Sequence, residues 1–592
     1  MRQVWGLYKE VLRAISPSAR NFLIWYAVLL GILSIIDSAA LGLLAILVAP
    51  LAVGDPVALP VFGELSTTQV FVTIGVLCVI IILKGVASLC VLLWGARKGE
   101  VYEIEIGSRL FSAFLRSPWE LRLTRNSSDI VRFTDGSVSI LVTSFLLPGA
   151  TLLSEALSFI SILLVLTVAQ PATAATTLVY LGLIAVVLYA WVARESRRAG
   201  EVYLKFAVLT SRLIFGMVAS MKEISLRGKL GEVGEVVNAS RRRTARARAN
   251  IMFLGQVPRY ALESGIIGGF VLVGLVGFWM GGSSGALTSV ALFSVAGFRM
   301  APAVIRAQTV LSELTANSPH ARVVLDEIYS SEKAREEFDS EQQLPLQVEP
   351  KSLKLENATF SYRGGSKPAL ENLSLTIEMG STVAFVGPSG SGKSTLIDMI
   401  LGFVQPQTGS IRIDEQPLAS VAEAWRLRLG YVPQDVSIFD GSVAENVALS
   451  WSGEYDEALV RKALDQARLL DTIEARPGGL QAQVGERGLT LSGGQRQRLG
   501  IARALYPEPL VLVMDEATSA LDTKTEAEVN EAIAALRGKT TLILVAHRLS
   551  TIMQADTIFY LRDGRLIDQG TFKELIERVP DFARQAELSG LA

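Results

Sequence analysis

The sequence predicts two fused domains: an α-helical domain with six membrane spans, followed by an α/β domain with a phosphate-binding loop. Half of the 592 residues are hydrophobic, mean hydropathy is +0.39 and only 19% are charged, which excludes a disordered or wholly soluble protein. Long apolar segments occupy only the first half, whereas short apolar runs alternate with amphipathic segments in the second. A chain this long divides into two to four units.

Six apolar segments are long enough to cross ~30 Å of hydrocarbon, which takes about 20 residues each. They cover residues 21–49, 68–95, 138–169, 171–193, 252–280 and 285–312. The first segment begins after a polar stretch, is too long for a removable signal peptide and lacks a small-residue cleavage site. We therefore expect the first span to remain as a membrane anchor.

Positive charge predicts the orientation of these spans, because short cytoplasmic loops retain Lys and Arg. The loop over 96–137 carries 7 of them and the loop over 194–251 carries 13, whereas 50–67 and 281–284 carry none. We expect both termini, both long loops and the second half of the chain in the cytoplasm, in a multi-pass protein of the cytoplasmic (inner or plasma) membrane. Both loops read as helical, so the helices continue beyond the bilayer.

Charge content indicates which ligands the protein is suited to bind, and cysteine content indicates which sites it lacks. Residues 1–345 hold 31 Lys and Arg against 25 Asp and Glu, an excess that favours anionic lipid headgroups over nucleic acid. The two cysteines, Cys78 and Cys90, lie in one apolar stretch. Their number and place exclude a disulfide framework and a zinc site.

A change of composition separates the two domains. Residues 1–320 form the predicted membrane domain, with its six helices and two long cytoplasmic loops. Residues 321–350 are acidic and polar with two prolines and no apolar period, which predicts a linker. Residues 351–592 then contain the apolar runs TVAFV, LVLVM and TLILV between helical segments, a pattern typical of a buried, mainly parallel sheet.

A glycine-rich loop follows the first of these strands. It reads GPSGSGKST and comprises Gly387, Pro388, Ser389, Gly390, Ser391, Gly392, Lys393, Ser394 and Thr395. Its glycines let backbone N–H groups converge on phosphate oxygens, Lys393 supplies charge at the β- and γ-phosphates, and Ser394 offers a hydroxyl to Mg²⁺. The alternative is a surface glycine loop, which the flanking strand and helix disfavour.

Two carboxylates, Asp515 and Glu516, follow the strand LVLVM. Asp515 fits the Mg²⁺ partner at a strand end of nucleotide hydrolases, and Glu516 fits the group that polarises the attacking water. The alternative is a pair of acidic residues at a helix start, where the dipole favours them. His547 follows TLILVA and is either structural or in contact with a γ-phosphate.

The string LSGGQRQR at 491–498, with SALD at 519–522, resembles the ATP-binding cassette (ABC) exporters of the type IV fold, in which membrane and nucleotide domains share one chain. This resemblance implies ATP as substrate and Mg²⁺ as cofactor. It implies that Tyr362 stacks on adenine, that Gln434 senses Mg²⁺ and the membrane domain, and that His547 is a catalytic switch. The metal set is then Ser394, Gln434 and Asp515, and the catalytic set is Glu516, His547 and Gln434.

In that family two nucleotide domains pack head to tail, so the resemblance implies a homodimer of this chain. The segment that closes over the partner's ATP comprises Leu491, Ser492, Gly493, Gly494 and Gln495. Residues 119–129 and 217–231 are candidates for the family's two coupling helices, with ordinary loop turns as the alternative.

Ionisable residues inside spans are costly and suggest a functional site. The seven are Asp37, Lys84, Glu155, Arg259, Glu263, Arg299 and Arg306. Of these, Lys84, Arg259, Arg299 and Arg306 are candidate ligands for an anionic cargo, with mutual ion pairing and snorkelling as the alternative.

The cargo expectation comes from a second resemblance. These basic residues, with KEISLRGKLGE at 222–232, resemble bacterial flippases of lipid-linked oligosaccharides. Lys84 stands in place of an arginine, and no external helix is evident in 50–67. Lipids, hydrophobic drugs and peptides are alternative cargoes. A soluble ATPase acting on nucleic acid or ribosomes is disfavoured by the spans, and a gated channel is a distant third.

Overall fold

A computed structural model describes residues 2–53, 57–59, 63–65, 67–169, 171–338, 344–346, 349–362, 364–365, 367–485, 488–517, 523–545, 549–589 and 591. It contains two compact units. The first comprises Met1–Ser117 and Leu123–Ala334, and the second comprises Pro118–Arg122 and Arg335–Ala592. The short segment Pro118–Arg122 therefore belongs with the C-terminal half of the chain.

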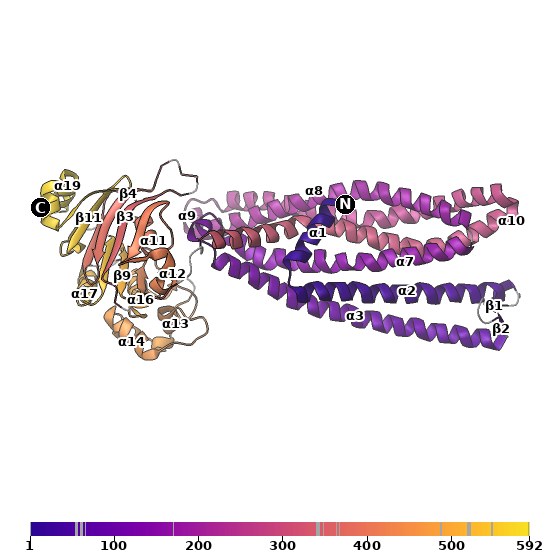
Figure 1. The fold of residues 1–592 in the computed structure, drawn as a ribbon, viewed down its shortest axis with the longest axis horizontal. Helices are drawn as coiled ribbons and strands as arrows, with labels where there is room; N and C mark the ends of the chain where they lie inside the picture. Colours follow the sequence, from indigo (N-terminus) through magenta and orange to yellow (C-terminus); the bar gives the residue numbers. More distant parts are fainter. Residues whose placement is uncertain are drawn as a thin grey trace. The chain divides into compact units, whose positions relative to one another are not determined.

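The first unit consists mainly of long helices (Figure 1). In chain order its elements are α1 (Arg2–Ala14), α2 (Pro17–Val53), β1 (Val57–Leu59), β2 (Gly63–Leu65), α3 (Thr67–Leu115), α5 (Ser127–Val131), η1 (Arg132–Ser137), α6 (Val138–Leu141), η2 (Val142–Leu146), α7 (Leu147–Ala169), α8 (Pro171–Ala219), α9 (Met221–Leu226) and α10 (Leu230–Phe338). Helix α4 (Trp119–Leu123) follows α3 in the sequence, but its residues up to Arg122 belong to the second unit. Helix α2 packs against α3 and α7, and α7 packs against α8. At ~1.5 Å per residue, the 49-residue α8 is about two and a half times as long as a ~30 Å bilayer core is thick.

Among the described residues, five helical stretches are long and apolar enough to cross a membrane. The last of them belongs to α10, which joins two helices across Gly281 (φ −147°) and Gly282 (φ +66°). These two glycines break the helix because their backbone angles are not helical. The predicted fifth and sixth spans, 252–280 and 285–312, are therefore the two arms of α10.

Two features of this unit were not evident from the sequence. Helix α10 continues to Phe338, so residues 321–338 of the predicted linker form a helix. Val324, Leu325 and Ile328 recur at helical spacing and are buried, and this short apolar period holds the segment in the helical core. Between α2 and α3, the described backbone forms an antiparallel pair of strands, β1 and β2.

The second unit contains two sheets. The six-stranded sheet has the order β12-β11-β5-β10-β9-β8, and every adjacent pair except β11–β12 is parallel. Its strands are β5 (Thr382–Val386), β8 (Leu429–Val432), β9 (Val511–Asp515), β10 (Thr541–Val545), β11 (Thr557–Arg562) and β12 (Arg565–Gly570). The predicted parallel sheet is thus confirmed. A four-stranded antiparallel sheet accompanies it, with the order β4-β3-β6-β7 and the strands β3 (Ser352–Phe360), β4 (Leu370–Glu378), β6 (Thr408–Ile413) and β7 (Gln416–Pro417).

Helices complete the core of this unit. They are α11 (Lys393–Ile400), α12 (Leu418–Arg426), α13 (Val443–Ala448), α14 (Glu457–Gln466), α15 (Leu470–Glu474), η3 (Gly479–Gln481), α16 (Gly493–Leu505), α17 (Thr523–Ala534), η5 (Leu549–Thr551), α18 (Phe572–Arg578) and α19 (Pro580–Leu588). One hydrophobic cluster joins the antiparallel sheet, α11 and α12 to β5, β9 and β10. A second joins α13, α14 and α16 to β8 and β9. Helix α11 is therefore held between the two sheets.

Candidate functional site

The glycine-rich loop connects β5 to α11, as the sequence predicts. All five residues of β5 are buried, and α11 begins at Lys393 after Gly392, whose φ is +99°. Two positions in the loop require glycine. A Cβ at Gly387 would lie 2.1 Å from the carbonyl oxygen of Leu561, and one at Gly392 would lie 2.6 Å from that of Ala369. Glycine at these two positions therefore lets the loop pack against the backbone of neighbouring segments.

Lys393 lies inside this loop and is buried. Its ammonium donates hydrogen bonds to the carbonyl oxygens of Gly387 at 2.7 Å and Pro388 at 3.0 Å. Burial lowers the pKa of Lys393, and the charges of Glu516 and Asp515 oppose that shift. Those two carboxylates are therefore close enough to act on the lysine electrostatically, although they lie more than one hundred residues away in the sequence.

Parallel pairing brings the other predicted groups to the same edge of the sheet. β10 lies between β5 and β9, with Val545 aligned both to Phe385 and to Asp515, so these three strands end at one level. Glu516 follows β9, and Gln434 follows β8, the next strand. The Gln434 amide Nε2 donates to Glu516 Oε2 at 2.8 Å. The fold thus brings together the loop, the two carboxylates and the glutamine.

Glu516 has an unusual backbone. Its φ is +51°, in the left-handed region where a side chain with a Cβ is strained by about 1–2 kcal/mol. The Glu516 N–H donates to the carbonyl oxygen of Val545 at 2.9 Å, which ties this conformation to the end of β10. Strain of this kind is concentrated at functional sites and is sustained by the surrounding fold.

The predicted metal set suits a hard divalent cation. Ser394 is exposed at the first turn of α11, and Asp515 is the last residue of β9. A hydroxyl, a carboxylate and an amide oxygen are hard donors, and Mg²⁺ typically takes one or two protein ligands and completes its shell with water and phosphate oxygens. The donor chemistry of Ser394, Asp515 and Gln434 fits that ion.

Two residues that sequence reasoning missed lie beside Asp515. Burial raises the pKa of Tyr431 to about 12, helped by Asp515, which hydrogen-bonds its phenol, and by Asp398. Burial also raises the pKa of Asp398 to about 6; Asp515 adds to the rise, and a hydrogen bond with Trp119 opposes it. A lone carboxylate within the apolar run of α11 was the available signal.

Trp119 packs against the second unit, to which it belongs, close to α11. Its ring stacks on Phe403 with centroids 5.2 Å apart, and Arg122 lies over the same ring.

The two candidate coupling segments do contain short helices, α4 and α5 in 119–129 and α9 in 217–231. Tyr362 is also near α11, because its hydroxyl lies 3.3 Å from Thr395 Oγ1.

The LSGGQ segment begins α16. The Ser492 hydroxyl accepts from the Gln495 N–H at 3.2 Å, and the Gln495 side chain accepts from the Ser492 N–H at 3.0 Å, which forms a capping box. Leu491 is buried in the core, whereas Ser492 and Gly493 are exposed. The helix start is therefore rigid and open to a ligand or to another chain.

Three of the four candidate cargo ligands form ion pairs in the first unit. Lys84 lies 3.4 Å from Asp37, Arg259 pairs with Glu263 at 2.9 Å, and Arg306 pairs with Glu155 at 2.7 Å. These contacts match the alternative of mutual pairing, although Arg259 and Arg306 remain more than half exposed. The side chain of Arg299 lies outside the described residues, as do His547 and SALD at 519–522.

Comparisons with known proteins agree with this arrangement. Residues 370–519 match the family model for the ABC transporter domain. The chain is 44% identical over 230 residues to an ATP-dependent lipid A-core flippase of Ralstonia nicotianae, covering 38% of this chain and 39% of that protein. It is 46% identical over 232 residues to the β-(1→2)glucan export ATP-binding/permease protein NdvA of Bradyrhizobium diazoefficiens, covering 39% and 38%.

A third relative, a multidrug resistance ABC transporter ATP-binding and permease protein of Lactococcus lactis, is 39% identical over 262 residues, or 43% of this chain and 44% of that protein. The chain thus spans about two-fifths of the length of these curated relatives. The solved structure of a bacterial Atm1-family ABC exporter with ATP bound has a TM-score of 0.76 at 24% identity, over 96% of this chain and 98% of that one. That likeness shows the fold.

Proposed function

We propose, from the premise that this chain carries an ABC transporter domain on the fold of an ABC exporter, that it couples ATP hydrolysis to export or flipping of a substrate across a membrane. The observation that carries the proposal is the hydrogen bond between Gln434 and Glu516 at the sheet edge that also holds the phosphate loop. We assign 351–592 as the nucleotide-binding domain, facing the cytoplasm with both termini.

Each residue of this edge has a chemical task. The loop amides and Lys393 bind the β- and γ-phosphates, and Tyr362 offers an aromatic face to adenine. Glu516 orients and polarises the attacking water, Gln434 holds that carboxylate in place, and His547 contacts the γ-phosphate. Ser394, Asp515 and Gln434 would hold Mg²⁺, and the ion would supply positive charge beside the phosphates.

The working form is a homodimer. The exposed Ser492 and Gly493 at the start of α16 offer a hydroxyl and backbone N–H groups to a γ-phosphate bound by Lys393 of a second copy. The capping box between Ser492 and Gln495 keeps that helix start ordered before the second copy arrives. The short helices α4 and α9 are the coupling elements between the membrane and nucleotide domains.

The substrate we favour is an anionic lipid-linked glycan. The relatives named for lipid A-core and for a β-glucan support a cargo that joins sugar to charge or lipid, and basic side chains lie within the predicted spans. The relative named for multidrug resistance supports the alternative, an exporter of lipids or hydrophobic drugs. A peptide exporter on the same scaffold is a further alternative.

Glu516→Gln tests the hydrolytic assignment. The variant should retain ATP binding, because Lys393 and Ser394 are untouched, but lose most turnover and accumulate as a closed dimer. Phosphate release and size-exclusion chromatography with ATP measure the two effects. Hydrolysis near the wild-type rate contradicts the role given to Glu516.

Mixing two inactive variants tests the paired sites. A Lys393→Ala chain combined with a Ser492→Ala chain should form one composite site that carries neither defect, so partial ATPase activity should return. A mixture no more active than either variant alone argues against head-to-tail pairing.

Transport assays in liposomes test the cargo. Arg299→Ala with Arg306→Ala should greatly reduce transport of a polyprenyl-pyrophosphate glycan while basal ATPase persists, since each charge-assisted contact contributes about 1.5–3 kcal/mol. Glu155→Gln is the control, because it removes the partner of Arg306 and leaves the arginine free. Normal glycan transport by the double variant refutes the cargo assignment.

A further inference from the structure

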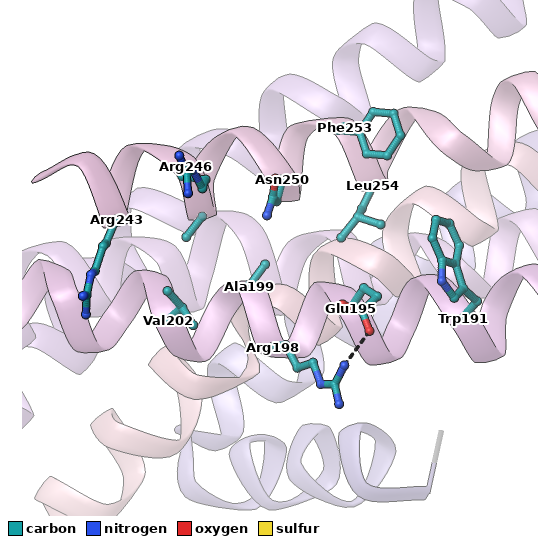
Figure 2. Close-up of a pocket in the computed structure, with 11 residues that line it drawn as sticks. Trp191, Glu195, Arg198, Ala199, Val202, Arg243, Arg246, Asn250, Phe253 and Leu254 are labelled. Atoms are coloured by element: carbon teal, nitrogen blue, oxygen red, sulfur yellow. Dashed lines mark hydrogen bonds and ion pairs between the residues drawn. The ribbon is translucent and has the colours of Figure 1, made fainter. Parts of the chain in front are cut away.

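A cavity of about 400 Å³ lies between α8 and the first arm of α10, and its lining residues include none of the four candidate cargo ligands. Its walls are one face of α8, running from Trp191 to Val202, and one face of α10, running from Arg243 to Leu254 (Figure 2). The two helices run in opposite directions, so Trp191 faces Phe253 and Leu254 at one end, whereas Val202 faces Arg243 at the other.

This arrangement gives the cavity an apolar end and a basic end. The aromatic end lies where the predicted fourth span finishes, at 193, and where the predicted fifth begins, at 252. The basic end lies in the extensions of both helices beyond the hydrocarbon. Trp191 is 51% exposed and Phe253 is 64% exposed, and tryptophan side chains are enriched at the boundary of a bilayer.

The charges of the cavity favour an anion. Arg198, Arg243 and Arg246 line it together with one carboxylate, Glu195. Glu195 is already neutralised, because Arg198 Nη1 lies 2.8 Å from its Oε1 (Figure 2). Within the described part of the chain, neither Arg243 nor Arg246 has a carboxylate partner, so both guanidinium groups retain N–H donors for a ligand.

Packing holds one of these arginines in place. The Arg243 guanidinium lies 4.8 Å from the centre of the Phe206 ring, a cation–π contact that leaves its edge free. Asn250 adds an amide on the same face of α10. Arg243, Arg246 and Asn250 lie at positions i, i+3 and i+7 of α10, and guanidinium and amide donors at that spacing suit a phosphate, which accepts several hydrogen bonds at once.

We propose that this cavity binds an anionic phospholipid of the inner leaflet, with its phosphate at Arg243 and Arg246 and an acyl chain against Trp191, Phe253 and Leu254. A basic pocket between helices at the cytoplasmic boundary matches the polarity of such a lipid along its length. The lipid is a resident ligand rather than cargo. The inference rests on the membrane placement given under the proposed function, but not on ATP hydrolysis or on the identity of the cargo.

Native mass spectrometry of the full-length protein, without ATP, tests the site. The probes are phosphatidylglycerol, phosphatidylcholine and inorganic phosphate. We expect saturable binding of phosphatidylglycerol, weaker binding of phosphatidylcholine, and no comparable binding of phosphate alone. Equal affinity for the two lipids overturns the role of charge, and equal affinity for inorganic phosphate overturns the role of the acyl chain.

Matched variants separate this cavity from general attraction to the membrane surface. Arg243→Gln with Arg246→Gln should weaken phosphatidylglycerol binding by about tenfold or more, since each charged hydrogen bond contributes over 1 kcal/mol. Arg241→Gln with Arg242→Gln removes the same charge from the same helix outside the cavity and should change binding little. Equal losses from the two pairs refute the proposal.

Two further variants guard against a folding defect. Arg243→Lys with Arg246→Lys preserves the charge and should retain more binding than the Gln pair, whereas Phe253→Ala preserves both arginines and should still weaken the diacyl lipid. No effect of Phe253→Ala contradicts the placement of the acyl chain. If the lipid binds to the monomer but not to the dimer, the proposal is also overturned, because a second copy of the chain covers the cavity in the dimer.

Discussion

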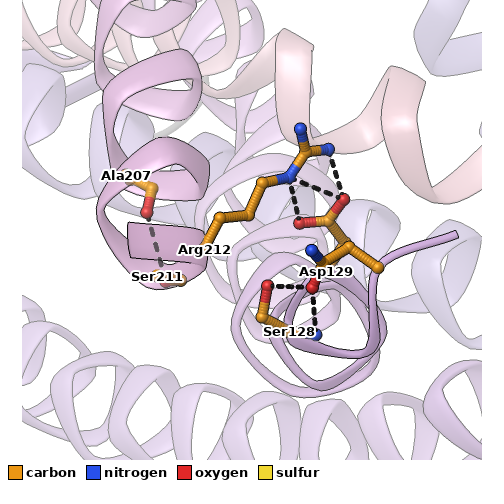
Figure 3. Close-up of polar contacts among 6 residues, drawn as sticks. Ser128, Asp129, Ala207, Ser211 and Arg212 are labelled. Atoms are coloured by element: carbon orange, nitrogen blue, oxygen red, sulfur yellow. Dashed lines mark hydrogen bonds and ion pairs between the residues drawn. The ribbon is translucent and has the colours of Figure 1, made fainter. Parts of the chain in front are cut away.

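The pair formed by Asp129 and Arg212 predicts an asymmetric response to mutation (Figure 3). Arg212 Nε donates to Asp129 Oδ1 at 2.9 Å and Oδ2 at 3.1 Å, and its Nη2 donates to Oδ2 at 2.5 Å. The Asp129 side chain is only 12% exposed, whereas that of Arg212 is 51% exposed. Removing the arginine therefore strands a buried carboxylate, but removing the carboxylate leaves an arginine that water can reach.

The burial of Asp129 sets the expected loss of stability in each variant. Breaking a fully buried ion pair by removing one partner costs about 3–5 kcal/mol, and the exposure of Arg212 lowers this to about 1–3 kcal/mol for Arg212→Gln. The nearby carboxylate of Glu327 adds to the stability lost in Arg212→Gln, because it repels the unpaired Asp129. Burial raises the pKa of Glu327, Arg125 lowers it, and the negative charge of Asp129 raises it again. Asp129→Asn relieves that repulsion and should cost only about 0.5–1.5 kcal/mol.

Thermal unfolding of the four proteins of a double-mutant cycle measures these costs. Melting temperatures in one detergent should fall further for Arg212→Gln than for Asp129→Asn. The double variant should lie close to Asp129→Asn alone, since the stranded charge is then absent. Equal losses from the two single variants, or additive losses in the double variant, refute the reasoning.

Three further predictions concern the second unit. Gly392→Ala should abolish binding of a fluorescent ATP analogue, because its Cβ would meet the Ala369 carbonyl at 2.6 Å, whereas Gly390→Ala, with open space around it, should be milder. Burial, with Asp515, raises the pKa of Asp398 to about 6 from 3.8, so the stability from this group is full below about pH 4 and is lost as pH rises through about 6. Hydrogen exchange in α11 should show Asp398→Asn removing that pH dependence. Trp119→Ala should reduce cargo-stimulated ATPase more than basal ATPase, and Trp119→Phe, which retains an aromatic ring against Phe403, should behave like the wild type.

The sequence alone predicted the elements that depend on local pattern. Continuous apolar runs located β5, β9 and β10, because a strand covered on both faces has no polar positions. Glycine spacing and its flanking elements located the phosphate loop. Apolar length located the spans, but β3, β4 and β6 were missed, because strands with exposed positions lack that continuous signal.

The end of α10 shows how a polar composition hides a helix. Residues 321–338 carry many charges, and only Val324, Leu325 and Ile328 mark the buried stripe. Packing against the rest of the helical core supplies most of the stability of such a segment, so its sequence alone resembles a linker. The boundary at Ala334 and Arg335 became visible only from contacts.

For the candidate site, sequence identified residue types and tertiary structure decided their partners. Glu516 and Gln434 are 82 positions apart, and parallel pairing of β8 with β9 places them 2.8 Å from each other. Arg306 and Glu155 are 151 positions apart, and helix packing places this candidate cargo ligand in an ion pair with Glu155. A motif specifies which groups a segment carries, but the distance between groups on different segments depends on how strands align and helices pack. That is why the phosphate loop was predictable from sequence, whereas the ion pairing of Arg306 was decided only by the fold.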